Sequence, residues 1–214
     1  NEGNCGEFFL YTVEVYALIL NTCGGEELED LYFVKGDKIP TLPIPTFEGY
    51  DFIGWYDIEN GAVNSGNLFN AETFEADTDI EIFAAWNGKE YVAKLDYATY
   101  GSGEIDQVTT QFGSPFTLPI PKSESNLKAF IGWYSELNAQ GERYTNEQGK
   151  SLKNWRDYGE VTLYAGWVDV FTFDLINDGK AYSVSKGPGI GYVSTVTIPT
   201  TYLGVPVTTV EASA

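Results

Sequence analysis

The chain has 214 residues, with 31 acidic and 12 basic side chains and a formal net charge of −19 at pH 7. This charge repels a phosphate backbone and anionic lipid, so it argues against nucleic acid and membrane surfaces as partners. The chain has two cysteines and no histidine, which excludes a Ser-His-Asp or Cys-His site and argues against zinc. We therefore expect no cofactor and no bound metal. No apolar run reaches 18 residues, so no membrane insertion is expected.

The first segment with strand character is Phe8–Leu20, which is rich in β-branched and aromatic residues. Asn21–Gly25 has the composition of a turn, because Gly and Asn accept positive φ at little cost. Leu28–Val34 then predicts a second strand, which completes a β-hairpin. Leu42–Pro45 carries two prolines, which cannot donate to a central ladder, so we expect an extended segment at a sheet edge.

Tyr50–Tyr56 is predicted to be the next strand. Regular alternation would place Ile53 and Trp55 together on one face of it. Gly54 lies between them and is expected to allow a close backbone approach or a bulge. Asp79–Trp86, with alternating isoleucines, predicts the strand that closes this unit.

Two intermediate segments carry helix signals. Asn67–Ala76 has the caps and spacing for at most a short helix. Thr145–Trp155 has Asn146 as a cap candidate, followed by acidic and basic residues at helical spacing. A short helix is therefore predicted more strongly for the second segment than for the first.

The order of landmarks in the first unit returns 76 to 81 residues further along the chain. Phe-Ile-Gly-Trp-Tyr occurs at Phe52–Tyr56 and again at Phe130–Tyr134. Leu-Pro-Ile-Pro precedes each copy, and a strand ending in tryptophan follows each copy. The second unit's strands are predicted at Tyr91–Tyr97, Ile105–Phe112 and Val161–Trp167. Repetition at this length indicates two copies of a small domain, because an open solenoid repeat is about half as long.

The tail from Val170 departs from this pattern. Val170–Ile176 and Ala181–Ser185 flank Asp178-Gly179, which suits a type I′ hairpin turn. Val193–Pro199 and Val205–Val210 predict further short strands. No third copy of the aromatic motif follows.

These elements predict a mainly β fold with short helices, of the α+β class. We expect two tandem β-grasp-like repeat domains and a small C-terminal β-hairpin module. The predicted organisation is an N-terminal tail at 1–9, repeats at 10–88 and 89–168, and the hairpin module at 169–214.

The two units resemble the Listeria-Bacteroides repeat, also called the internalin B-type B repeat. The first unit carries the motif of that family at Gly49–Tyr56 and ends in the looser Ile82–Trp86. The second unit keeps the closing motif at Leu163–Trp167 but has Lys128-Ala129 where the family has Gly-Tyr. The resemblance implies a β-grasp-like fold with a short helix, on secreted or wall-attached bacterial proteins with adhesive or spacer roles.

The tail is similar to the start of a Bacteroides surface protein A-type leucine-rich repeat region. The similar residues are Gly179–Val184, Val196–Pro199 and Gly204–Thr208. This resemblance implies that a longer parent protein carries a leucine-rich array after this part of the chain.

The candidate site residues belong to the repeated signature. They are Phe52, Gly54, Trp55, Tyr56, Trp86, Phe130, Gly132, Trp133, Tyr134 and Trp167. Aromatic residues fixed in register in both copies are more often core than binding residues. The alternative is that Trp55, Trp133 and the neighbouring tyrosines stack on sugars.

Three further chemistries remain open from the sequence. Cys5 and Cys23 could form a disulfide if the protein is exported, or stay as free thiols. Glu26–Asp30 and Asp77–Asp79 offer hard oxygen ligands, but neither has the spacing of a known calcium loop. A carboxylate pair for glycoside hydrolysis is defined by its separation in space, which the sequence does not give.

The sequence thus favours a non-enzymatic, exported bacterial protein at the cell surface or cell wall. It would act as an adhesin or spacer that presents a binding surface to a protein or glycan on a host or neighbouring cell, as a monomer. The runner-up is a carbohydrate-binding module that captures polysaccharide with exposed Trp and Tyr rings. That second function requires solvent-exposed rings, whereas the first does not.

Overall fold

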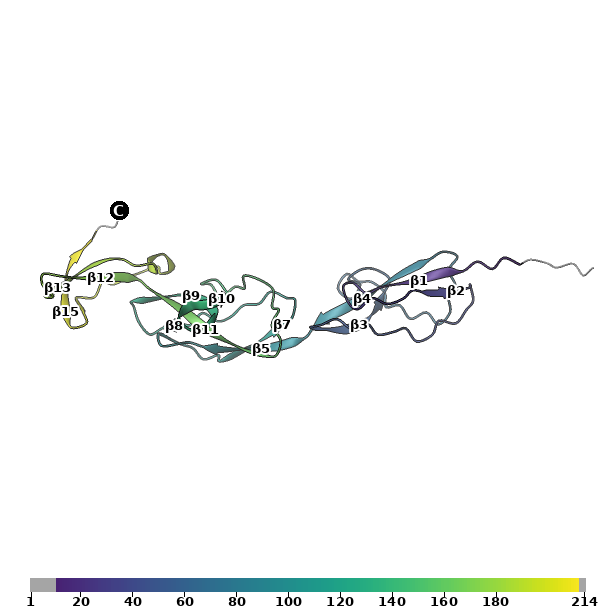
Figure 1. Cartoon of the computed structure of the whole chain (residues 1–214), viewed down its shortest axis with the longest axis horizontal. Helices are drawn as coiled ribbons and strands as arrows, with labels where there is room; N and C mark the ends of the chain where they lie inside the picture. Colours follow the sequence, from purple (N-terminus) through teal and green to yellow (C-terminus); the bar gives the residue numbers. More distant parts are fainter. Residues whose placement is uncertain (1–10, 212–214) are drawn as a thin grey trace, which may run out of the picture. The chain divides into compact units, whose positions relative to one another are not determined.

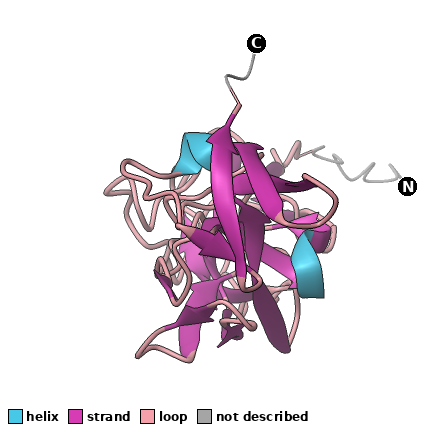
Figure 2. Cartoon of the chain, turned by 90° about the vertical axis from the view of Figure 1, so that its left-hand side faces the viewer, coloured by secondary structure: helices cyan, strands magenta, loops and turns pink. Residues whose placement is uncertain are grey.

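The computed structural model describes residues 11–211. The chain divides after Lys89 into two compact units, and each is described by itself. Most of the regular structure is β-strand (Figure 2). The prediction of a mainly β fold is therefore confirmed.

The first unit contains one four-stranded sheet (Figure 1). Its strands are β1 (Tyr16–Asn21), β2 (Leu31–Phe33), β3 (Tyr50–Tyr56) and β4 (Ile80–Gly88). Their order in the sheet is β2-β1-β4-β3. The central pair β1 and β4 is parallel, and the two outer pairs are antiparallel. Apolar side chains of β1 and β4 pack with Trp55 and Phe74 to form the core.

The second unit repeats this sheet and adds one strand. Its strands are β5 (Glu90–Asp96), β7 (Gln107–Gln111), β9 (Lys128–Glu136), β10 (Gln140–Arg143) and β11 (Glu160–Asp169). Read from the β7 edge, the order is β7-β5-β11-β9-β10, which corresponds to β2-β1-β4-β3 with β10 added. The central pair β5 and β11 is again parallel. Two short strands, β6 (Gly101–Ser102) and β8 (Lys122–Ser123), pair with each other.

A smaller four-stranded sheet follows in the same compact unit. It consists of β12 (Phe171–Ile176), β13 (Ala181–Lys186), β14 (Thr201–Tyr202) and β15 (Val205–Val210), in the order β12-β13-β15-β14. The predicted β12-β13 hairpin is confirmed. Val170, Phe171 and Val184 form a buried cluster with Ala129 of β9, so this sheet packs on the preceding one. The boundary expected at residue 169 therefore lies inside one compact unit.

Both helix predictions are wrong, because neither Asn67–Ala76 nor Thr145–Trp155 forms a helix. The only helical segments among residues 11–211 are the 3₁₀ turns η1 (Leu137–Ala139) and η2 (Ile190–Tyr192). In Thr145–Trp155, the Asn146 side chain accepts hydrogen bonds from the amides of Gln148 and Lys150, at 3.0 and 2.9 Å. Such a side-chain bond closes a turn instead of starting a helix. Gly149 then adopts φ +76°, which ends the possibility of a helix there.

The first strand is shorter than predicted. Residues 8–10 lie outside the described part of the chain, and residues 11–15 are exposed and form no strand. The strand begins at Tyr16, where pairing with Phe33 of β2 starts. Val193–Pro199 also forms no strand, and Leu42–Pro45 pairs with no neighbour. Val193–Pro199 has a β-forming composition but no partner strand, and pairing decides the outcome.

The predicted faces of β3 are also wrong, because a bulge interrupts its register. Phe52 pairs with Trp86 and Gly54 with Ala85, so Ile53 is an extra, unpaired residue. The bulge turns Ile53 into solvent and brings Phe52 and Trp55 to the same core. Strand β9 has the same irregularity, since Phe130 and Gly132 pair with neighbouring residues of β11. The expectation of a bulge at Gly54 is confirmed.

Candidate functional site

The central tryptophan of each motif is a core residue. Trp55 is 4% exposed and Trp133 is 0% exposed. The indole Nε1 of Trp55 donates to the carbonyl of Pro43 at 3.1 Å, and that of Trp133 donates to Pro119 at 2.9 Å. Each Leu-Pro-Ile-Pro segment is therefore tied to the ring by a carbonyl that no strand partner uses.

The closing tryptophans make an equally repeated contact. The indole Nε1 of Trp86 donates to the Thr22 carbonyl at 2.8 Å, and that of Trp167 donates to the Tyr97 carbonyl at 3.1 Å. Each ring lies against a glycine, Gly25 or Gly101, where a Cβ would stand 2.5 or 2.4 Å from the ring. The sequence predicted a turn at Asn21–Gly25 but indicated neither ring contact.

A phenylalanine joins the two tryptophans within each unit. The Phe52 ring meets both Trp55 and Trp86 edge to face at 5.6 Å between centroids. Phe130 meets Trp133 at 5.8 Å and Trp167 at 5.7 Å in the same geometry. These contacts occupy the ring faces and edges that a sugar would need. The sugar-stacking alternative thus loses the central tryptophans on which it rested.

The two motif tyrosines differ in exposure. Tyr134 is buried and lies over Gly166, where a Cβ would stand 2.4 Å from its ring. Tyr56 is half-buried and packs against Gly61 in the same way. Both rings therefore contact backbone of their own unit.

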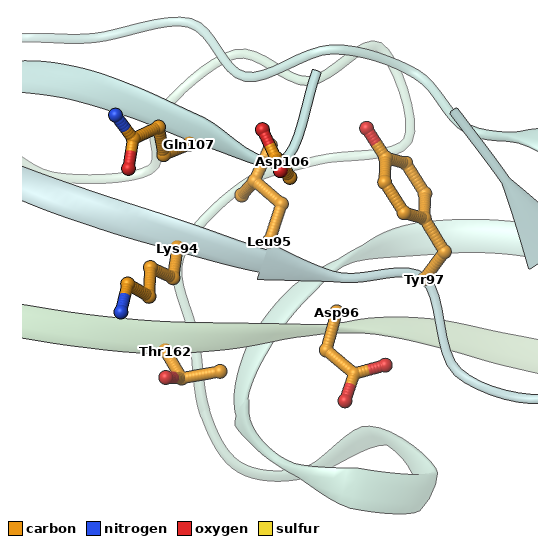
Figure 3. Close-up of a pocket in the computed structure, with 7 residues that line it drawn as sticks. All are labelled: Lys94, Leu95, Asp96, Tyr97, Asp106, Gln107 and Thr162. Carbon is orange, nitrogen blue, oxygen red and sulfur yellow. The ribbon is translucent and has the colours of Figure 1, made fainter. Parts of the chain in front are cut away.

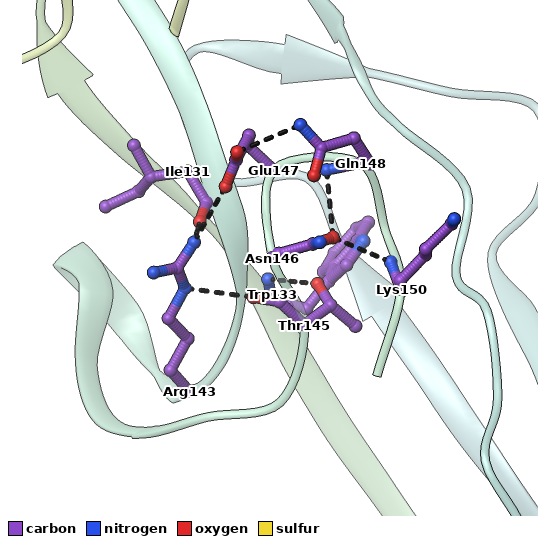
Figure 4. A network of polar contacts seen from close by, with 8 residues as sticks. All are labelled: Ile131, Trp133, Arg143, Thr145, Asn146, Glu147, Gln148 and Lys150. Atoms are coloured by element: carbon purple, nitrogen blue, oxygen red, sulfur yellow. Dashed lines mark hydrogen bonds and ion pairs between the residues drawn. The ribbon is translucent and has the colours of Figure 1, made fainter. Parts of the chain in front are cut away.

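An arginine supports the bulge of the second unit (Figure 4). Arg143 Nη2 donates to the Ile131 carbonyl at the bulge, and Nε donates to the Thr145 carbonyl at 2.9 Å. The same guanidinium is 3.2 Å from Glu147. The buried Thr145 hydroxyl in turn accepts the Trp133 amide at 3.0 Å. Sequence reasoning missed this network, because a bulge carbonyl gives no signal in the sequence.

We expect Arg143→Ala to lower the free energy of unfolding of the second unit by about 1–3 kcal/mol, because two carbonyls lose their charged donor. Chemical denaturation followed at this unit measures the loss. Glu147→Gln is the control and should cost less, since its ion pair with Arg143 is partly exposed. Equal losses in both variants would contradict the bulge-supporting role.

Trp155 is a second core residue that the sequence did not single out. It is fully buried, and its indole Nε1 donates to the Asp157 carbonyl at 2.8 Å. Its carbonyl accepts the Gly113 amide at 2.8 Å, as the carbonyl of the fully buried Phe74 accepts Gly36 in the first unit. Phe74 and Trp155 thus occupy equivalent places, although one is phenylalanine and the other tryptophan.

An open hollow of about 460 Å³ lies where β5, β7 and β11 meet (Figure 3). Two of its charged groups have other partners: Lys94 is 2.7 Å from Glu160, and Asp96 accepts the Ala98 amide at 2.8 Å. The Asp96 and Tyr97 side chains point away from each other. A catalytic pocket brings a few polar groups together on one point, and this hollow does not.

The small C-terminal sheet carries the more apolar groove. Its volume is about 350 Å³, and its floor includes the buried Phe171 and Val184. Val196, Ile198 and Val210 line it and are exposed. An uncovered apolar groove of this kind marks a surface suited to contact with another part of a protein.

The acidic runs considered for calcium make other contacts. Asp77 pairs with Lys35 at 2.8 Å, and Asp79 accepts the Ala17 amide at 2.8 Å. Asp30 accepts the Leu20 amide at 3.1 Å. Within residues 11–211, no three metal-binding side chains of His, Cys, Asp or Glu gather at one point.

Cys23 lies partly exposed in the turn after β1, with no disulfide to any residue in the range 11–211. Burial, and then the nearby carboxylates of Glu59 and Glu81, raise its pKa, which disfavours the reactive thiolate. Cys5, its predicted partner, lies outside the described residues, so the disulfide stays a prediction.

Asp57 shows how one carboxylate closes the loop after β3. It accepts both the amide of Asn67 at 2.7 Å and the side-chain nitrogen of Asn67 at 2.8 Å. These bonds hold the pKa of Asp57 below its ordinary value, the side-chain bond most strongly. A carboxyl whose folded pKa is lowered stabilises the fold above its unfolded pKa, and that stabilisation is lost as the pH falls through the folded pKa.

We therefore expect the first unit to lose stability as the pH falls below about 4, the ordinary pKa of an aspartate, and Asp57→Asn to flatten this loss. Denaturant midpoints measured across this range give the result. Asp51→Asn is the control, because Asp51 lies 3.8 Å from Lys89 with both side chains largely exposed. Parallel pH curves for Asp57→Asn and the unchanged protein would contradict the assignment.

Comparison with known proteins finds a family match in the first unit. The profile of the Listeria-Bacteroides repeat domain matches residues 16–85. No solved structure matches the chain. The matched residues run from the start of β1 to within β4, so they include β1, β2 and β3 and most of β4.

Three curated relatives come from two bacteria. A candidate membrane protein of Evansella cellulosilytica is 27% identical over 194 residues, which cover 88% of this chain and 26% of the relative. A candidate Gly-rich membrane protein of the same organism is 26% identical over 79% of this chain and 18% of its own length. Internalin H of Listeria monocytogenes is 29% identical over 60% of this chain and 20% of its own length.

The chain spans about a quarter or less of these relatives. None of the helices among residues 11–211 has the length and hydropathy needed to cross a bilayer. The matched repeat domain and the relatives together indicate a surface or exported repeat protein.

Proposed function

We propose that the chain is part of a non-enzymatic bacterial surface protein in which two tandem Listeria-Bacteroides-type repeats act as spacers. The observation that carries this proposal is the equivalence of the two sheets. The first matches the family profile, and the second has the same strand order around a parallel central pair. Residues 90–169 are then a second copy of the repeat.

The tryptophan contacts support the same reading. The central and closing indoles of both units donate to backbone carbonyls at equivalent positions. A repeat whose signature residues are used for packing can vary its surface freely, which suits a spacer.

The C-terminal sheet is proposed to begin a leucine-rich region that presents the binding surface. Strands β13 and β15 are parallel and joined by a crossover, and the apolar groove beside Val210 is what a further coil would cover. The expected partner is a protein or glycan on a host or neighbouring cell, bound by a monomer.

Immunolabelling of the intact protein on its native cells tests the surface role. Antibodies raised against this chain should label cells that have not been permeabilised, and mild protease treatment of whole cells should remove the label. Labelling only after permeabilisation would overturn the proposed function.

A further inference from the structure

Strand edges of the first unit are closed to further pairing. Every sheet edge carries unpaired N–H and C=O groups that can bind another strand, unless the edge is short, bulged, charged or covered. Strand β2 has only three residues. Strand β3 is bulged at Ile53 and bridged to Leu68 through Tyr56. A partner strand would find no long regular ladder on either edge.

The second unit has two edges without these features, β7 and β12, and only β12 is rich in apolar residues. Strand β10 has a register shift and carries Glu142 and Arg143, and β14 has two residues. Strand β7 is regular, but Val108 is the only apolar residue in it. Strand β12 pairs with β13 in unbroken register over six residues, contains no proline, and has one charged residue, Asp174.

The hydrogen bonds around β13 show which groups of β12 face outward. The Val184 carbonyl accepts a hydrogen bond from the Glu211 amide, so the backbone groups of Val184 point toward β15 and away from β12. Phe173 is the register partner of Val184. In an antiparallel pair these directions alternate along the strand. The N–H and C=O groups of Phe173 and Leu175 therefore point away from β13, to the open edge.

One face of β12 is apolar and the other is polar, so the side chains of a partner strand can be matched to them. On one face Phe173 stacks on Tyr202 at 3.9 Å between ring centroids, and Leu175 beyond it is 55% exposed. On the other face Thr172 and Asp174 are exposed. An added strand would place apolar side chains beside Leu175 and polar side chains beside Asp174.

We propose that the open edge of β12 binds an extended, basic segment of a partner protein, which adds to the sheet as a fifth strand. The net charge of −19 and the Asp174 carboxylate favour lysine or arginine in that segment. The same charge opposes pairing with a second copy of this chain. The inference deepens the proposed function, because it names one surface by which a presented module would contact its partner.

A blocked octapeptide in which valine and lysine alternate is the probe, and amide hydrogen exchange of the intact chain is the readout. We expect saturating peptide to slow exchange at Phe173 and Leu175 at least about tenfold, because their N–H groups become hydrogen-bonded. The peptide with glutamate in place of lysine, and the peptide with a central proline, should not protect these amides. Protection by either control peptide, or no protection by the probe, would overturn the proposal.

Two variants in β12 and a control variant in β7 test the edge. Leu175→Pro removes an outward N–H without removing a bond to β13, and should weaken peptide binding at least tenfold. Thr109→Pro is its match on β7, where Leu95 donates to Asp106 and the alternation directs the Thr109 N–H outward; it should leave binding unchanged. Asp174→Lys should also weaken peptide binding, because it repels the basic peptide, and it introduces no proline into the strand. Unchanged binding in both β12 variants would overturn the proposal.

The free protein provides the remaining test. Slow exchange at Phe173 and Leu175 without peptide, together with a concentration-dependent dimer, would show a second copy at this edge and would overturn the basic-peptide assignment. Failure of cell labelling with intact peptide protection would instead overturn only the surface role.

Discussion

Replacing Trp133 by alanine is expected to lower the free energy of unfolding of the second unit by about 3–5 kcal/mol. The ring is fully buried between Phe130 and Tyr97, so its removal leaves a large cavity. The Pro119 carbonyl also loses its indole donor. Urea unfolding with a probe in the second unit measures the change.

Trp133→Phe is the matched control for this prediction. It keeps an aromatic ring but removes the indole N–H, so it should cost less than the alanine variant. A loss below about 1 kcal/mol for Trp133→Ala would be typical of a surface residue and would contradict a core role.

The second large effect is expected at Gly149. It has φ +76°, and a Cβ there would stand 2.1 Å from the Leu118 carbonyl oxygen. That oxygen belongs to the backbone of a buried residue, so it cannot move aside easily. We expect Gly149→Ala to cost about 2–5 kcal/mol, as backbone strain and overpacking combine.

Gly159→Ala separates the two causes. Gly159 has nearly the same φ, +71°, but no atom lies within 4 Å of its added Cβ. This variant should therefore show only the strain of positive φ, about 1 kcal/mol. Thermal or urea unfolding of both variants gives the comparison, and equal losses would show that the contact with Leu118 is unimportant.

The sequence predicts strands well where composition and pairing agree. Tyr50–Tyr56 is a strand with the predicted bounds, and both predicted hairpins are present. The predicted face of Trp55 is wrong because one extra residue, Ile53, moves every later side chain of the strand to the opposite face. The helix predicted for Thr145–Trp155 is absent because an asparagine that caps a helix and one that closes a turn have the same local sequence.

The repeated signature was found in the sequence, but its partners were not. Repetition identified the motif tryptophans, whereas their acceptors are carbonyls of Pro43, Pro119, Thr22 and Tyr97. A carbonyl acceptor is common to all residue types, so no residue pattern can reveal it. Arg143 and Trp155 were missed for a related reason, because the first unit uses other residues at these places.

The two units keep the same strand order but place different residues over the bulge. Over Gly54 of the first unit lies Leu68, whereas Arg143 lies over Gly132 of the second. In the first unit the leucine covers the glycine by apolar contact. In the second unit the arginine covers it and donates hydrogen bonds to carbonyls. The tryptophan contacts are common to both units, so they carry the shared part of the fold.

Hydrogen exchange of the five indole N–H groups in the intact chain tests directly whether the repeated aromatics are structural. All five indoles donate to backbone carbonyls in the structure. Each should therefore exchange at least about a hundredfold more slowly than free tryptophan, at rates set by unfolding of its unit. Exchange of Trp55 or Trp133 at the free rate would contradict the core assignment and would return these rings to the surface as binding residues.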